Sequence, residues 1–163
     1  MEFSSIQEWV LQFIKHKDIF DRKVTKLEEN SEGVRVTRKD GSVVSWIAKD
    51  AFSYSSKEKT TASSRMIACL NTRENVKEIV KHWKELVLDS ALTIWCVDLE
   101  TGEKWSVTPR VHDLITEPSA LEQGLLSLMD TANGVVKEEP KRKKKQSIFE
   151  ESENSEAGKE EET

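Results

Sequence analysis

The sequence is poor in glycine, cysteine and proline, and each shortage excludes a class of protein. It has 6 glycines, and no pair of them brackets a phosphate-binding turn, so the nucleotide-hydrolysing and dinucleotide-binding classes are excluded. Its 2 cysteines and 3 prolines exclude a disulfide-built miniprotein and a collagen-like rod. The sequence contains no apolar run of about 18 residues, so it predicts no membrane span.

The first ten residues do not predict a signal peptide. Met1–Val10 includes Glu2 and Glu8 and lacks the basic head and long apolar core of a signal peptide. Cys69 and Cys96 both lie in apolar runs, where a cysteine behaves as a small buried hydrophobe. We therefore expect an intracellular, cytoplasmic protein, which a eukaryotic cell could import into the nucleus through the basic run described below.

Charge divides the chain into two parts. The last 27 residues, 137–163, hold seven Lys or Arg, nine Asp or Glu and three apolar residues, so burial cannot offset their ordering entropy. The preceding 136 residues carry a net charge of −3 and enough apolar side chains for a core. We predict one globular domain over residues 1–136 and a disordered, charge-segregated tail over 137–163.

The first half of the domain reads as a helix followed by strands. Apolar residues at helical spacing predict a helix over Ser5–Lys17, begun by a capping box of Ser5 and Glu8. Three segments, the last two joined by an Asp-Gly pair, predict an antiparallel meander: Lys23–Glu29, 34–38 and Val43–Ala48. The serine-rich stretch 53–64 predicts a surface loop or a seam between two halves.

The second half alternates strands and helices. Met66–Leu70 and Leu92–Val97 are apolar runs of strand length on either side of a helical stripe, Val76–Val87, and they suit a parallel βαβ unit. Asn71 is placed to cap that helix. The remaining elements are a strand over Lys104–Thr108, ended by Pro109, and a last helix from Thr116 to Asn133.

The predicted order is therefore α-β-β-β-β-α-β-β-α. An antiparallel meander cannot be combined with a βαβ unit in a purely parallel sheet, because the two pair their strands in opposite senses. We expect an α+β fold in which helices pack on a mixed or mainly antiparallel sheet.

Asp98, Glu100 and His112 are the candidate catalytic residues. Carboxylates at a strand end can hold a divalent cation, and a nearby histidine can act as a general base, as a metal-assisted hydrolase or nuclease requires. The alternative is that these carboxylates belong to an ordinary charged hairpin turn and have no catalytic role, because turn tips are normally polar. The three histidines lack the spacing of a zinc site, and no pattern indicates a cofactor.

Five tryptophans are more than usual for a chain of 163 residues. Core packing accounts for most of them, but Trp105 follows a turn and is flanked by Lys104 and Ser106. We therefore expect Trp105 to be the most exposed tryptophan. An exposed aromatic side chain contributes a large contact area at low entropic cost, so Trp105 is a candidate anchor for a protein partner.

The tail holds two candidate binding segments. The first is a run of five cations that suits nuclear import or a weak, salt-sensitive contact with nucleic acid: Lys141, Arg142, Lys143, Lys144 and Lys145. The second is Ile148 and Phe149, the only large apolar residues in the tail, which suit a short anchor for another protein. The alternative is a solvated polyampholyte that only keeps the protein soluble.

These observations favour a non-enzymatic, intracellular domain that binds another macromolecule, with the tail as an auxiliary arm and no contact with a membrane. The excess of tryptophan and the absence of catalytic motifs in the sequence support this interpretation. The metal-assisted hydrolase or nuclease that uses Asp98, Glu100 and His112 is the alternative from another class. A structural subunit of a larger assembly is the third.

Overall fold

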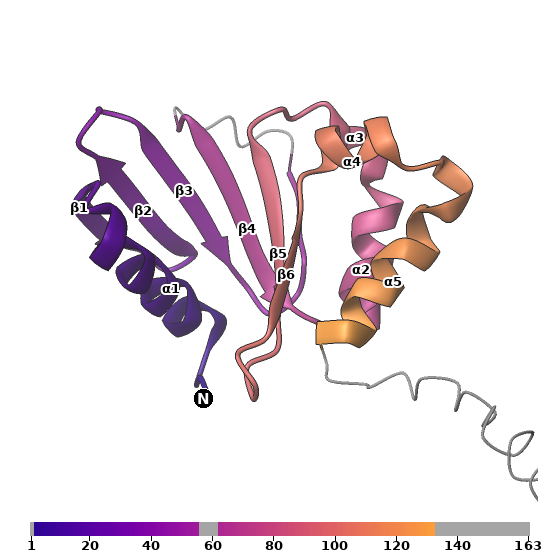
Figure 1. The fold of residues 1–163 in the computed structure, drawn as a ribbon, viewed down its shortest axis with the longest axis horizontal. Helices are drawn as coiled ribbons and strands as arrows, with labels where there is room; N and C mark the ends of the chain where they lie inside the picture. Colours follow the sequence, from indigo (N-terminus) through magenta and orange to yellow (C-terminus); the bar gives the residue numbers. More distant parts are fainter. Residues whose placement is uncertain (1, 56–61, 133–163) are drawn as a thin grey trace, which may run out of the picture.

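The computed structural model describes residues 2–55 and 62–132. These residues form a six-stranded sheet with helices on both faces (Figure 1). The strands are β1 (Val24–Glu29), β2 (Gly33–Arg38), β3 (Val43–Ala48), β4 (Ser64–Leu70), β5 (Leu92–Val97) and β6 (Lys104–Val107). The helices are α1 (Ile6–Asp21), α2 (Arg73–Lys81), α3 (Trp83–Val87), α4 (Pro109–Ile115) and α5 (Leu121–Ala132), with a 3-10 turn at Pro118–Ala120.

The sheet is mixed, which confirms the α+β prediction. The strands lie side by side in the order of the sequence, from β1 to β6. Strands β1, β2 and β3 form the antiparallel meander, and β6 pairs antiparallel with β5. The β3–β4 and β4–β5 pairs are parallel, so β4, α2, α3 and β5 form the expected crossover unit. The sheet continues across the segment 53–64, because the strands on either side of it pair with each other.

The helix α1 begins where the sequence predicts and ends four residues later. Ser5 is its N-cap, and its Oγ accepts the N–H of Glu8 at 3.1 Å. The carboxylate of Glu8 turns back to the backbone N–H of Ser4 at 2.7 Å, one residue before the cap. The helix ends because Arg22 adopts a left-handed conformation (φ 48°), and Asp18 Oδ1 accepts the N–H groups of Lys23 and Val24 that lead into β1.

Four expectations about the other helices are corrected. Asn71 does not cap α2: the N-cap is Thr72, whose hydroxyl accepts the N–H of Asn75 at 3.2 Å. The single predicted helix breaks at His82 into α2 and α3. Pro109 ends β6 and also begins α4, an unpredicted helix, because proline at the first helical position has no N–H to leave unpaired. The last helix starts only at Leu121, after the 3-10 turn.

Each face of the sheet has its own core. On one face α1 covers a smaller core: Ile6, Trp9, Val10, Ile14, Val34, Val36, Val44, Trp46, Ala68 and Val97. On the other face, residues of α2, α3 and α5 pack over Ile67, Cys69, Leu92, Ile94, Cys96, Trp105 and Val107. Helix α1 therefore covers one face alone, while α2, α3, α4 and α5 lie on the opposite side of the sheet (Figure 1). No helix in residues 2–55 or 62–132 is long and apolar enough to cross a membrane.

Cys69 and Cys96 face each other in register on β4 and β5. Both are buried free thiols, with their sulfur atoms 3.8 Å apart. The hydrogen bond with the Cys69 thiol and burial together raise the pKa of Cys96 well above its usual range. The expectation that these cysteines act as small core residues is confirmed.

We expect neither thiol to react with a thiol-specific disulfide reagent at neutral pH while the domain is folded, because the thiolate is the reactive form and both sulfurs are buried. In denaturant both should react. The raised pKa of Cys96 also makes the stability of the domain depend on pH. The contribution of Cys96 to stability is complete below about pH 8.5, the ordinary pKa of a cysteine in an unfolded chain. Above that pH the contribution falls, because the unfolded state loses the thiol proton more readily than the folded state. Native labelling as fast as denatured labelling would contradict the buried placement.

Candidate functional site

A groove opens between the second half of α1 and the sheet. Its volume is about 190 Å³. The helix contributes Phe13 and Ile14, and the sheet contributes mainly apolar side chains: Val24, Val36, Val44, Trp46, Met66 and Trp95. Five charged residues also line it: Lys17, Asp18, Asp21, Lys23 and Arg38. The groove therefore combines aromatic surface with a charged rim.

Four aromatic rings from three elements pack together at this groove. Phe13 lies 5.0 Å from both Trp9 and Trp95, measured between ring centroids. Trp46 lies 5.9 Å from Phe13 and 6.1 Å from Trp95. These separations are typical of favourable aromatic pairs, which contribute about 0.5–1.5 kcal/mol each beyond burial. Lys104 Nζ lies 5.4 Å from the Phe13 centroid, so a cation also contacts the cluster.

Trp95 carries an unsatisfied polar group. Its Nε1–H is buried and has no acceptor among residues 2–55 and 62–132. The tryptophans of the opposite face differ, because Trp83 Nε1 donates to Asp113 Oδ1 at 3.1 Å and Trp105 Nε1 donates to Asn71 Oδ1 at 2.7 Å. The indole N–H of Trp95 therefore reports on the α1 face of the sheet, and those of Trp83 and Trp105 report on the opposite face.

Positive charge predominates along the groove. Lys17, Lys23 and Arg38 form no ion pair with any residue in the part of the chain that the structure describes. One of the two lining carboxylates, Asp18, already accepts the backbone N–H groups of Lys23 and Val24, which follow α1. An anionic group that entered the groove would meet three cations without ion-pair partners.

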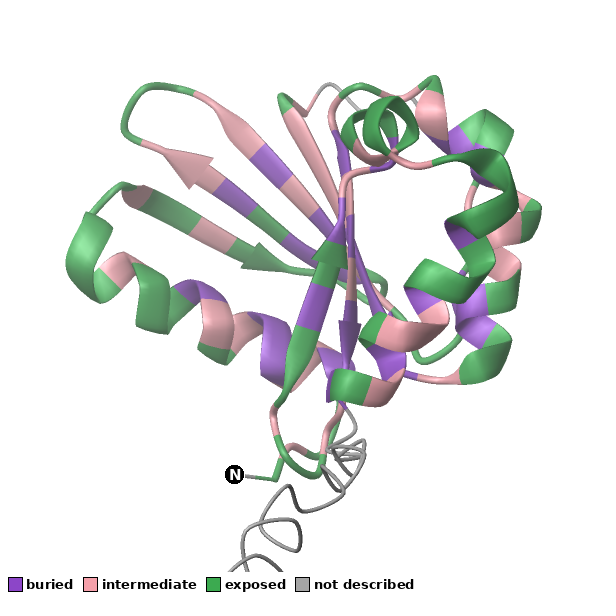
Figure 2. Cartoon of the chain, turned by 45° about the vertical axis from the view of Figure 1, so that its right-hand side comes forward, coloured by how far each residue is buried: buried purple, intermediate pink, exposed green. Residues whose placement is uncertain are grey.

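A second surface consists of exposed apolar side chains on α4. Val111, Leu114 and Ile115 lie three and four residues apart, on one face of the helix, and are 54%, 83% and 76% exposed. Pro109 is the only residue of α4 that is buried, and Figure 2 shows this helix exposed at the end of the helical layer. We call Val111, Leu114 and Ile115 the α4 patch. Leu88, at the end of the neighbouring α3, is 80% exposed.

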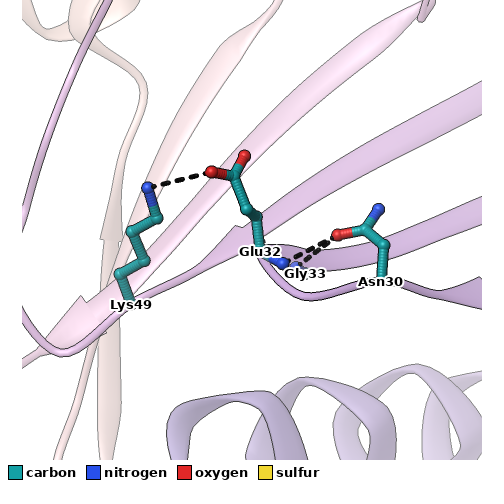
Figure 3. A network of polar contacts seen from close by, with 4 residues as sticks. All are labelled: Asn30, Glu32, Gly33 and Lys49. Atoms are coloured by element: carbon teal, nitrogen blue, oxygen red, sulfur yellow. Dashed lines mark hydrogen bonds and ion pairs between the residues drawn. The ribbon is translucent and has the colours of Figure 1, made fainter.

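A polar network at the other end of the meander is structural. Asn30 Oδ1 accepts the N–H groups of Glu32 and Gly33 at 2.9 and 2.8 Å, which shapes the turn between β1 and β2 (Figure 3). Glu32 also lies 3.6 Å from Lys49 Nζ, and both side chains are exposed. Exposed pairs of this kind contribute at most about 1 kcal/mol, so the network fixes a turn rather than forming a site.

The structure does not bring the candidate catalytic residues together. Asp98 and Glu100 lie in the turn between β5 and β6, where Asp98 Oδ1 accepts the N–H of Glu100 at 2.9 Å and thereby shapes the turn. His112 lies on α4, beyond the far end of β6, and its Nδ1 is 3.2 Å from the carbonyl oxygen of Thr108. The strand between them spans about 10 Å. No group of three or more His, Cys, Asp or Glu among the described residues is arranged to hold a metal ion.

The expected exposure of Trp105 is wrong. The side chain is only 8% exposed and packs in the core beneath α2 and α5. Side chains alternate along β6, so Lys104 and Ser106 are exposed on the α1 side of the strand while Trp105 and Val107 are buried on the opposite side. The apolar Val107, two residues on, was the available signal for this orientation. Trp105 therefore offers little surface to a partner in this structure.

The candidate binding residues of the tail lie outside the described residues. These are Lys141, Arg142, Lys143, Lys144, Lys145, Ile148 and Phe149. Neither the groove nor the α4 patch was among the sites predicted from the sequence. Phe13 and Trp9, four residues apart on a helix, were a signal for the aromatic cluster, but their contact with Trp46 and Trp95 depends on the order of the strands. Comparison of the chain with protein-family models, curated proteins and solved structures gives no match.

Proposed function

We propose that this protein is a non-enzymatic, intracellular domain that binds another protein, and that the α4 patch is its docking surface. The observation that supports the proposal is the outward apolar face of α4. Three large aliphatic side chains stand mostly in water on a helix that contributes one buried residue to the domain. An exposed apolar cluster of this kind is typical of an interaction surface.

The energetic argument favours a partner. Complete burial of one aliphatic side chain contributes about 1.5–3 kcal/mol, so Val111, Leu114 and Ile115 together could contribute roughly 5 kcal/mol to a complex. The same residues contribute little to the fold, because they remain exposed. The hydrolase alternative has no comparable support, since Asp98 and His112 lie at opposite ends of the β5–β6 hairpin. The tail as an auxiliary arm remains a proposal that rests on its sequence.

Replacing Leu114 and Ile115 with aspartate should abolish the interaction and leave the fold intact. Two central contacts of about 2 kcal/mol each correspond to a loss of affinity of several hundred-fold or more. The control is Ile19→Asp with Phe20→Asp, which changes two exposed apolar residues at the end of α1. The measurement is calorimetric titration of full-length protein with the partner identified by cross-linking in cells. Equal affinity of the two double variants would overturn the proposal, as would a partner that dissociates only when the α1 pair is changed.

A further inference from the structure

The size of the groove under α1 limits what it can hold. Its volume of about 190 Å³ is close to that of a cavity of about 150 Å³ that holds a benzene molecule. Pockets for cofactors and drug-sized ligands are larger, about 300–1,000 Å³. The groove therefore accommodates one ring or one large side chain rather than a cofactor.

The lining defines the chemistry of that side chain. The rings of Phe13, Trp46 and Trp95 offer aromatic surface against which another ring can pack. Lys17, Lys23 and Arg38 line the same groove and have no ion-pair partner in residues 2–55 or 62–132. The chemistry that fits is an aromatic residue with carboxylates next to it in the sequence.

The chain itself contains such a segment. Residues 133–163 hold a single aromatic residue, Phe149, and it is followed directly by Glu150 and Glu151. We propose that the groove between α1 and the sheet binds Phe149 of the chain's own tail, with Glu150 and Glu151 at the cationic rim. This site is separate from the α4 patch and does not depend on the function proposed for it.

The length of the tail allows this contact. The described chain ends at Ala132, and sixteen residues separate it from Phe149. An extended segment of that length spans about 55 Å, whereas a domain of about 130 residues has a radius of gyration of about 14 Å. The helices α5 and α1 cover opposite faces of the sheet (Figure 1). The segment can therefore pass around the domain and reach the groove.

The strength of the contact favours a tethered occupant. Burying a phenyl ring contributes about 1.5–3 kcal/mol, and an exposed ion pair at the rim adds at most about 1 kcal/mol. The upper end of that range, about 4 kcal/mol, corresponds to a dissociation constant of about 1 mM. A free peptide would rarely reach this concentration, but a short flexible tether maintains a local concentration in the millimolar range. The groove can therefore be occupied by the protein's own tail without any partner of high affinity.

Nuclear magnetic resonance of the indole N–H groups in the full-length protein tests the proposal. Phe149→Ser should shift the signals of Trp46 and Trp95, whose rings line the groove, because the ring current of the bound phenyl is lost. The signals of Trp83 and Trp105 should stay unchanged, since both lie in the core of the other face. Ile148→Ser is the matched control, and it should shift Trp46 and Trp95 much less. Lys23→Glu should reproduce part of the Phe149→Ser shift at low salt.

The results of these measurements either support or overturn the contact between Phe149 and the groove. Identical Trp46 and Trp95 signals in the wild type and in Phe149→Ser would overturn the proposal. Shifts that grow with protein concentration would also overturn it, because they would mean that the groove binds the tail of a second copy. A nuclear Overhauser contact between the Phe149 ring and Trp46 or Trp95, independent of concentration, would establish the intramolecular contact. Unchanged Trp83 and Trp105 signals in every variant verify that the fold is intact.

Discussion

Replacing Gly33 with alanine should destabilise the domain by about 3 kcal/mol or more, the upper range for overpacking in a rigid site. A Cβ atom at this position would lie 1.8 Å from the carbonyl oxygen of Trp46 and 2.8 Å from its carbonyl carbon. Both are backbone atoms of the neighbouring strand, so no side chain can rotate away to relieve the contact. The strands β2 and β3 would have to separate where Gly33 pairs with Ile47.

The matched control is the same substitution at Gly124. This glycine lies inside α5, and a Cβ atom there meets nothing within 4 Å. Alanine is the better helix former, so Gly124→Ala should stabilise the domain by about 0.5–1 kcal/mol. Urea unfolding followed by tryptophan fluorescence measures both changes. Stability changes of the same sign for the two variants would contradict the close approach of β2 and β3.

Asn75→Leu should destabilise the domain by roughly 3–5 kcal/mol. The side chain is 5% exposed and its Oδ1 accepts the N–H of Phe52 at 2.9 Å. Its Nδ2 donates to the carbonyl oxygens of Asp50 and Leu70, both at 2.8 Å. Leucine has a similar volume but leaves the buried N–H of Phe52 without a partner, which costs about 1–3 kcal/mol. It also removes one of the two hydrogen bonds that each carbonyl accepts, at about 0.5–1.5 kcal/mol each, and leaves only the bonds from the N–H groups of Leu70 and Thr72. That loss approaches the whole stability of an ordinary domain, about 5–15 kcal/mol.

Asn30→Leu is the control for this prediction. Asn30 also accepts two backbone N–H groups, but its surroundings are exposed, so water can replace its amide. The expected loss is about 1 kcal/mol or less. Thermal unfolding of both variants, supported by hydrogen exchange at the Phe52 amide, separates the two cases. Equal losses of stability in the two variants would show that the hydrogen bonds of Asn75 do not hold the segment after β3 against α2.

The order of elements could be read from the sequence because most of them have local signals. Periodic apolar residues, a serine cap and an Asp-Gly turn determine α1 and the meander. The capping of α2 could not be read in the same way. Asn71 and Thr72 are both good caps, and the choice between them depends on Trp105, which lies far along the chain and draws Asn71 into the core. Tertiary contact decides between two residues of equal local preference.

The candidate sites were harder to predict than the fold. The groove depends on rings from α1, β3 and β5, whose proximity requires the order of the strands in the sheet. The α4 patch belongs to a helix that was not predicted, since Pro109 is equally typical of a strand end and of a helix start. The segments of the tail remain predictions, because they lie outside residues 2–55 and 62–132.

The sheet adds its strands in the order in which the ribosome makes them. Each strand from β2 to β6 pairs with the strand that precedes it in the chain, so its partner has already been synthesised. Nearest-neighbour pairing keeps the sequence separation of contacts low, and such topologies fold quickly. No strand of the sheet therefore needs a partner from a distant, later part of the chain in order to pair. We infer that the domain can assemble progressively during translation, from α1 and the meander onward.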